Sequence, residues 1–246
     1  LYRLHPALRG YLQQQMPAPE NIQRCFIYII SKYANILIIA PFYNLCAFLC
    51  AYIVNMYRAN RLAESLVIDD DFITITRCLA HYAQESRQFS EASRLYTILL
   101  RHKKIQDNEE RAMVLHQLGL ISQEQFDFKT AESLYNESLE ISKNNGYELI
   151  SAYTYHQLGS IAQNNRNFSL AEICYTESIR IKEKYGDYYG AANTRDQMSI
   201  LWWERQDFSA AEDYCKSALA IWEEHGDKYR MASAYHQLGI IAQAQQ

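Results

Sequence analysis

The sequence predicts an all-helical fold built from stacked pairs of helices, and three regularities carry that prediction. The tetrapeptide His-Gln-Leu-Gly stands at 116–119, 156–159 and 236–239, and residues 196–199 fall on the same 40-residue grid. Small residues keep this period as well. They are Gly146, Gly186 and Gly226, and also Ala131, Ala171 and Ala211. A fixed period of this length is typical of repeats that bury their apolar faces against each other, not of one closed domain.

Residues 152–187 show how one repeat is built. Tyr155, Leu158 and Ala162 follow the spacing of one face of a helix. The polar run Asn164–Asn167 then interrupts this face and suits a tight turn. A second helical stripe follows, made of Phe168, Ala171, Tyr175, Ser178 and Ile181. Each repeat is therefore predicted to be two antiparallel helices.

The positions of glycines and lysines also agree with a pair of helices in each repeat. Gly159 and Ala171 are small where the two helices must approach each other closely. Gly186 follows Lys182 and Lys184, as expected for a glycine that ends a helix with cations in its last turn. These residues predict where the second helix stops and how tightly it packs.

The motif formed by Tyr155, Leu158, Gly159, Ala171 and Tyr175 resembles the tetratricopeptide repeat. The resemblance covers residues 72–246. It implies a right-handed superhelical solenoid over 69–246, with about four full repeats and a truncated fifth. Two departures are the 40-residue period, where the usual repeat has about 34 residues, and the lack of a proline after the second helix. In both respects the chain resembles the longer-helix subclass of these repeats, which occurs in kinesin light chains and many bacterial signalling proteins.

Two units match this motif less closely. The fourth repeat has Ser199 in place of the glycine, Arg195 in place of the aromatic residue, and Cys215 where the third repeat has Tyr175. An earlier unit fits at a 39-residue offset through Leu79, Ala80, Ala92 and Tyr96.

Residues 1–15 form an amphipathic segment with Leu4, Leu8 and Leu12 on one face. Residues 2–11 resemble the end of the winged-helix subdomain in STAND-type signalling NTPases, where a histidine at the place of His5 senses the nucleotide phosphate. The resemblance implies that 1–15 are a remnant of that subdomain. An ordinary helix is the alternative. The sequence holds no G-x-x-x-x-G-K-[ST] motif, so we expect the nucleotide-binding core outside this chain, in a longer protein.

Residues 16–68 are predicted to be a helical connector that caps the array. No charged residue occurs from Tyr33 to Tyr57, so a membrane span must be considered. Pro41 splits this stretch into two short pieces, which favours a buried helical hairpin. Residues 58–67 are predicted to be one more short helix. Asp69–Asp71 are then expected to cap a helix that starts near Phe72.

The composition of the chain limits the kinds of partner and cofactor that it is expected to bind. The net charge is −4 and no long basic run occurs, which argues against nucleic acid as a partner. The six cysteines show no paired framework, so a reducing cytoplasm is the expected compartment. Cys46 and Cys50 are one helical turn apart, but no histidine is near them in sequence. We therefore predict no metal and no cofactor.

In tetratricopeptide arrays the first helices line a concave groove that binds a protein or peptide. The residues of these helices that share one face are rich in amides, which can hold the backbone of an extended peptide. The candidate ligand-binding residues are Arg77, His81, His116, Gln117, Gln123, His156, Gln157, Gln163, Asn193, Asp196, Gln197, Trp203 and His236. This face lacks a cluster of lysines and arginines, so a clamp for a ligand carboxylate is not expected.

The recurring His-Gln pairs have two interpretations. They could contact ligand and respond to pH, or they could bridge neighbouring repeats by hydrogen bonds. A binding site tends to break the symmetry of a repeat. Residues that do so therefore carry more weight, namely Arg77, His81, Asn193, Asp196 and Trp203.

No spacing typical of a nucleophile, a metal site or a phosphate loop occurs, so we predict that the chain is not an enzyme. The first hypothesis is a protein- or peptide-sensing arm of a STAND-type NTPase, which could oligomerise through that effector. The alternatives are a freestanding adaptor, a small-molecule sensor of a transcriptional regulator, and a tether to a membrane through 33–57.

Overall fold

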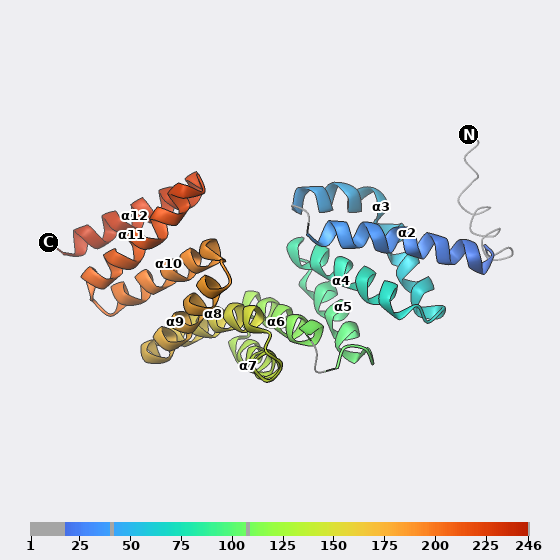
Figure 1. Ribbon diagram of the computed structural model, residues 1–246, viewed down its shortest axis with the longest axis horizontal. Coiled ribbons are helices and arrows are strands. Elements are labelled where there is room, and N and C mark those ends of the chain that lie inside the picture. Colours follow the sequence, from blue (N-terminus) through green and yellow to red (C-terminus); the bar gives the residue numbers. More distant parts are fainter. Residues whose placement is uncertain (1–17, 40–41, 107–108, 246) are drawn as a thin grey trace. The chain divides into compact units, whose positions relative to one another are not determined.

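The computed structural model describes residues 18–39, 42–106 and 109–245, without the side chains of 42–51. Within this part of the chain there are eleven α-helices and no strand (Figure 1). The predicted all-helical class is confirmed. The chain divides into two compact units at Lys104 and Ile105, and each is described by itself.

The first unit contains two helix pairs. They are α2 (Glu20–Ile38), α3 (Phe42–Ser65), α4 (Asp69–Glu85) and α5 (Phe89–Arg101). Helices α2 and α3 both pack on α4, which pairs with α5. A buried hydrogen bond of 2.9 Å joins Thr76 Oγ1 to Asn60 Oδ1, and the Tyr57 hydroxyl donates to Glu91 at 2.7 Å. These bonds tie α3 to the pair α4–α5.

Two helices form where the connector hairpin was predicted, since α2 ends at Ile38 and α3 begins at Phe42. The burial predicted for this hairpin is incomplete, because Ile36 is 61% and Val54 is 74% exposed. None of the helices in the described ranges is both long and apolar enough to cross a membrane. The separate short helix predicted for 58–67 is wrong, because these residues continue α3 to Ser65. Met56, Ala59 and Ala63 are fully buried at helical spacing, so one apolar stripe runs on without a break.

The prediction that Asp69–Asp71 cap a helix starting near Phe72 is wrong. Helix α4 begins at Asp69 itself, with Ile68 at the N-cap and no side-chain cap bond. The three carboxylates lie in the first turn, where they complement the helix dipole. Asp69 Oδ1 lies 3.4 Å from His102 Nε2, and the ammonium of Lys104 lies 2.8 Å from Asp70 Oδ1. The acidic run therefore joins the start of α4 to the segment after α5.

The second unit continues the pattern over seven helices. They are α6 (Glu109–Glu124), α7 (Phe128–Asn145), α8 (Glu148–Asn164), α9 (Phe168–Lys184), α10 (Tyr188–Glu204), α11 (Phe208–Glu224) and α12 (Lys228–Ala244). Each second helix packs on its own first helix and on the next one. Helices α8 to α12 all have 17 residues, and three-residue turns join them. Two such helices and two such turns account for the 40-residue period of the sequence.

Glycine in the first helix makes room for a tyrosine of the second. A Cβ atom on Gly159 would lie 2.6 Å from Cε1 of Tyr175, so only glycine fits there. In the fourth repeat both members change together. Ser199 replaces the glycine and Cys215 replaces the tyrosine, and Ser199 Oγ donates to the Ala211 carbonyl at 2.7 Å. The smaller thiol leaves the space that the serine occupies, which explains the departure from the motif.

The turns between the helices of the second unit each contain one residue with a left-handed backbone conformation, that is, a positive φ. Gly186, with φ +75°, follows α9 and ends it as predicted. The turns inside a repeat instead place a side-chain-bearing residue there, for example Arg166 with φ 60°. The limits predicted for the connector (16–68) and the array (69–246) stay predictions. The predicted winged-helix remnant, 1–15, lies outside the described residues.

Candidate ligand-binding groove

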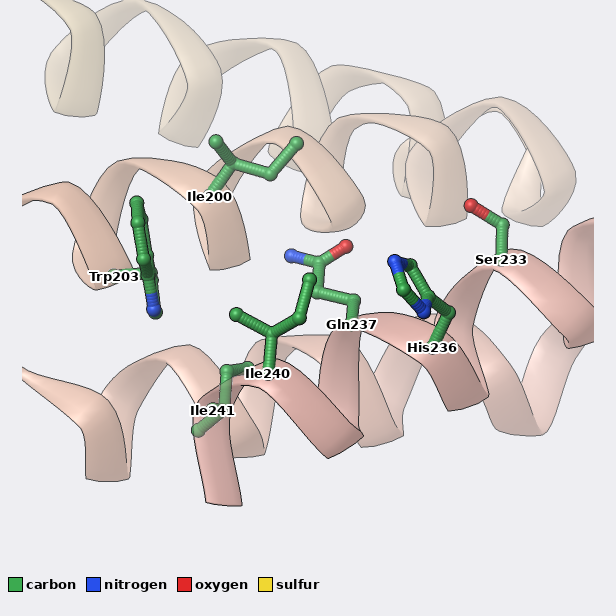
Figure 2. A pocket seen from close by; sticks show the side chains of 7 residues that line it. All are labelled: Ile200, Trp203, Ser233, His236, Gln237, Ile240 and Ile241. Carbon is green, nitrogen blue, oxygen red and sulfur yellow. The ribbon is translucent and has the colours of Figure 1, made fainter. Parts of the chain in front are cut away.

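A pocket of about 250 Å³ lies between α10 and α12, both of which are first helices of their repeats. Its lining residues are Ile200, Trp203, Ser233, His236, Gln237, Ile240 and Ile241. Figure 2 shows the indole of Trp203 at one end and the side chains of His236 and Ser233 at the other. The pocket therefore has an apolar end and a polar end.

The apolar end exposes large side chains to solvent. Trp203 is 40% exposed and Ile240 is 41% exposed, although both are large and apolar. Ile200 comes from α10 and Ile241 from α12, so two repeats build this end together. Exposed apolar side chains around a concavity are typical of a surface that binds a partner.

At the polar end, one amide is already held by the fold. Gln237 Nε2 donates to Ser199 Oγ at 2.9 Å, a bond from α12 to α10. His236 is exposed and its ring faces the pocket. The hydroxyl of Ser233 completes this end. These groups can donate and accept hydrogen bonds beside the apolar surface.

The other two histidines of the repeat bridge neighbouring first helices. His116 Nδ1 lies 3.2 Å from Thr154 Oγ1, and His156 Nδ1 lies 3.1 Å from Thr194 Oγ1. Burial lowers the pKa of His116 to about 4 and that of His156 to about 3, and the charge of Lys182 contributes to both shifts. Both rings are therefore neutral near pH 7. These hydrogen bonds join neighbouring repeats, as expected if the two histidines have a structural role.

Lys182 lies in the last turn of α9, as predicted, but its ammonium is buried, with 3% of the residue exposed. Its Nζ donates to Thr194 Oγ1 at 2.9 Å and lies 5.2 Å from the centroid of the Tyr153 ring. Burial lowers the pKa of Lys182 to about 8. The ammonium thus supports the same threonine that His156 contacts.

Two of the amides predicted to bind ligand accept hydrogen bonds from the second helix of their own repeat. Gln123 Oε1 accepts a bond of 3.0 Å from the Tyr135 hydroxyl, and Gln163 Oε1 accepts one of 2.9 Å from the Tyr175 hydroxyl. Gln163 also donates to Glu204 Oε2 at 3.1 Å, across two repeats. The remaining amides of this face, Gln117, Gln157 and Gln197, are half-buried on successive first helices.

Asp196 and Asn193 differ from the rest of the face. Asp196 is 8% exposed, and its Oδ1 has no hydrogen-bond partner in the described part of the chain. The same holds for Oδ1 of Asn193, one turn earlier on α10. Burial raises the pKa of Asp196, although the charge of Arg230 opposes this. Both oxygen atoms are buried, and neither residue lines the pocket.

Arg77 and His81 lie half-buried on α4, in the first unit. The structure therefore brings Trp203 and His236 together, and leaves Asn193 and Asp196 on the same face of α10. The sequence prediction missed Ile200, Ser233, Ile240 and Ile241. Ile200 directly follows Ser199 and Ile240 directly follows Gly239, the glycine position of each repeat, so the period did mark them. Apart from Trp203, however, only polar residues were selected. In the described residues, no group of three or more His, Cys, Asp or Glu side chains could hold a metal.

Comparison with known families agrees with this architecture. Residues 113–145 and 150–224 each match a family model described as tetratricopeptide repeat. A search of curated protein sequences found no match. The chain thus contains tetratricopeptide repeats, which form a scaffold that generally binds proteins.

Solved structures share the fold at low sequence identity. BtubC (BKLC) from P. vanneervenii superposes with a TM-score of 0.69 at 21% identity, over 80% of this chain and 84% of that one. A STAND protein with a tetratricopeptide repeat sensor, from Pyrococcus horikoshii, gives 0.70 at 15% identity. It covers 94% of this chain, which spans 35% of that protein's length. At these identities the likeness shows the fold, a solenoid of helix pairs.

Proposed function

We propose that this chain is a protein- or peptide-binding arm of a larger signalling protein of the STAND class. The observation that carries the binding role is the pocket of Trp203, Ile200 and Ile240, which offers exposed apolar surface between two first helices. Polar groups at its other end would orient the ligand. Binding there would stabilise one relative arrangement of α10 and α12, because the ligand touches both.

The likeness to a STAND protein over 94% of this chain supports the link to an NTPase. The resemblance of residues 2–11 to a winged-helix end supports it independently. The 17-residue helices and three-residue turns also support placing these repeats in the longer-helix subclass. In this proposal the arm works in the cytoplasm, and ligand binding releases the attached NTPase for oligomerisation.

The test uses the complete gene product. Its coding sequence should contain a phosphate-binding loop upstream of Leu1. ATP hydrolysis and particle size are then measured for the complete protein and for a Trp203→Ala variant, each with cell extract fractionated for a stimulating ligand. We expect stimulation of the wild type and a loss of at least about tenfold in the variant. A protein without a nucleotide-binding module, or equal stimulation of both, would contradict the proposal and favour a freestanding adaptor.

A further inference from the structure

A second pocket lies beside the second helices of two repeats, where no ligand-binding residue was predicted. Residues of α7 and α9 line its sides and residues of α8 line its floor, and its volume is about 270 Å³. The floor is apolar and includes Leu158, Ile161 and Ala162. Two large apolar side chains of α9 that line the pocket are exposed, Leu170 by 43% and Ile173 by 60%. An open apolar pocket of this kind can receive side chains of a partner.

The chain itself fills the same place in the next repeat. One period later in the sequence, Trp202 stands where the pocket has Ala162, and Arg205 stands where it has Asn165. Trp202 packs against two buried clusters, one with residues of α9 and one with residues of α11. Arg205 Nη1 lies 2.6 Å from Glu172 Oε2, and Arg205 Cζ lies 4.2 Å from the centroid of the Trp202 ring. An indole and a guanidinium that pairs with a carboxylate therefore occupy this position.

The carboxylate that corresponds to Glu172 is Glu132, and it has no arginine beside it. Glu132 lines the pocket from α7 and is exposed, and none of the hydrogen bonds or ion pairs of the described residues involves it. Asn165, which replaces Arg205, supplies no positive charge. The pocket thus has an apolar floor and an accessible carboxylate, but it lacks the two groups that fill its counterpart.

We propose that this pocket binds a helix of a partner protein that carries an aromatic side chain and, three residues later, an arginine. Trp202 and Arg205 have this spacing, and residues three apart lie on one face of a helix. The aromatic ring covers Ala162 and the apolar side chains around it, and the guanidinium pairs with Glu132. The inference goes beyond the proposed function, because its residues belong to α7, α8 and α9 and not to the pocket of Trp203.

The probe is a fluorescent peptide of about 20 residues, rich in alanine, glutamate and lysine, which is long enough to form a helix. It carries tryptophan in the middle and arginine three residues later. One control probe has citrulline in place of the arginine, and another has the arginine two residues after the tryptophan, on a different face. Fluorescence anisotropy with the full chain should show that the first probe binds at least about tenfold more tightly than either control. Random heptapeptides are too short to form this helix and do not report on the pocket.

Variants of the chain test the two parts of the pocket. Glu132→Gln should bring the affinities of the arginine and citrulline probes to within about twofold of each other. The double variant Ala162→Trp with Asn165→Arg fills the pocket as the next repeat does, and should weaken binding of the first probe at least about tenfold. If the double variant does not fold, Glu132→Gln still gives an independent result, because Glu132 is exposed. Glu140→Gln, exposed on α7 and outside the pocket, removes the same charge and should retain the full arginine preference.

The results that would overturn the inference are distinct. Equal affinity of the arginine and citrulline probes, or an arginine preference that survives in Glu132→Gln, overturns it. Full binding by a folded double variant also overturns it, because the helix then binds elsewhere. If binding is lost in Trp203→Ala and kept in the double variant, the helix binds between α10 and α12, which overturns this inference and supports the proposed function. Binding of no probe overturns this inference alone, because heptapeptide retention tests the pocket of Trp203 separately.

Discussion

At the residue scale, pairs of side chains that change together explain the fourth repeat. Gly159 makes room for Tyr175, whereas Ser199 takes the space that Cys215 leaves. The sequence showed each substitution, but its period alone does not reveal which positions touch. Only the packing of the two helices shows that Ser199 and Cys215 compensate each other.

Replacing Gly159 by alanine tests this packing. The new methyl group would lie 2.6 Å from the Tyr175 ring, so the tyrosine must move, and we expect a loss of about 1 to 3 kcal/mol in unfolding free energy. Chemical denaturation followed by circular dichroism measures it. Gly239→Ala is the matched control, because no atom lies within 4 Å of its added Cβ. Equal stability of the two variants would show that the contact is unimportant.

The buried histidines predict a loss of stability in acid. Their folded-state pKa values, about 4 for His116 and about 3 for His156, lie below the unfolded value of about 6.5. Between these values the unfolded chain binds protons that the folded chain does not. Stability therefore falls as the pH drops from about 6.5 toward 4, by up to about 1.4 kcal/mol per pH unit for each histidine.

A double variant, His116→Gln with His156→Gln, should flatten this part of the pH profile. His236→Gln, at an exposed position, is the control and should leave the slope as in the wild type. Urea unfolding at several pH values between 7 and 4 gives the comparison. Identical slopes in all three proteins would contradict the buried, neutral state of the two rings.

Asp196 gives a pH dependence of the opposite sign. Its folded-state pKa is raised by burial, above the unfolded value of about 3.9. The folded chain then holds the proton longer, so stability falls as the pH rises through this window. Asp196→Asn should therefore stabilise the chain at neutral pH and have little effect below pH 3.9, as measured by thermal unfolding. Destabilisation at neutral pH would show that the carboxylate has a partner in the fold.

At the element scale, helix starts recur every 20 residues. Asp127, Asn167, Asp187, Asp207 and Asp227 are N-caps whose side chains accept from the third residue of their helix. The polar run at Asn164–Asn167 was predicted as a turn from composition. Its capping role was not predicted, because the glycines and the His-Gln motif recur only every 40 residues and do not mark the start of every helix. The same 20-residue signal is present in the sequence itself.

Removing one of these caps should weaken its helix. Asp207 Oδ1 accepts from the Ala210 N–H at 3.0 Å, and Asp207→Ala should lower the unfolding free energy by about 1 kcal/mol. Asp213→Ala, in the middle of the same helix and exposed, should lower it far less or raise it slightly. Equal effects of the two changes, measured by denaturation, would mean that the cap bond does not contribute.

At the scale of the whole molecule, the period predicted the stack of helix pairs. That the first helices line a ligand-binding groove came from the family resemblance and stays a prediction. The period did not predict the pocket, because that depends on two isoleucines, one each from α10 and α12, that meet only in the folded chain. The long apolar stretch between Tyr33 and Tyr57 was ambiguous by composition alone. The proline at position 41 favoured two helices, which α2 and α3 confirm, but not the burial that was predicted with them.

The two compact units predict that residues 105–246 fold alone. Their helices pack on one another through each repeat, so the piece keeps its own core. Circular dichroism of this piece should show a helical chain with cooperative unfolding. A random-coil spectrum would contradict the division into units.

The central claim is that ligand binds on the first helices around Trp203. The most direct measurement passes a pool of random heptapeptides over the immobilised chain and compares the retention of peptides by two double variants. Trp203→Ala with Ile240→Ala alters the pocket between α10 and α12, whereas Leu170→Ala with Ile173→Ala alters exposed apolar residues of another pocket, on α9. We predict at least a tenfold loss of retention for the first and less than about a twofold loss for the second. The opposite order, or equal losses, would contradict the claim.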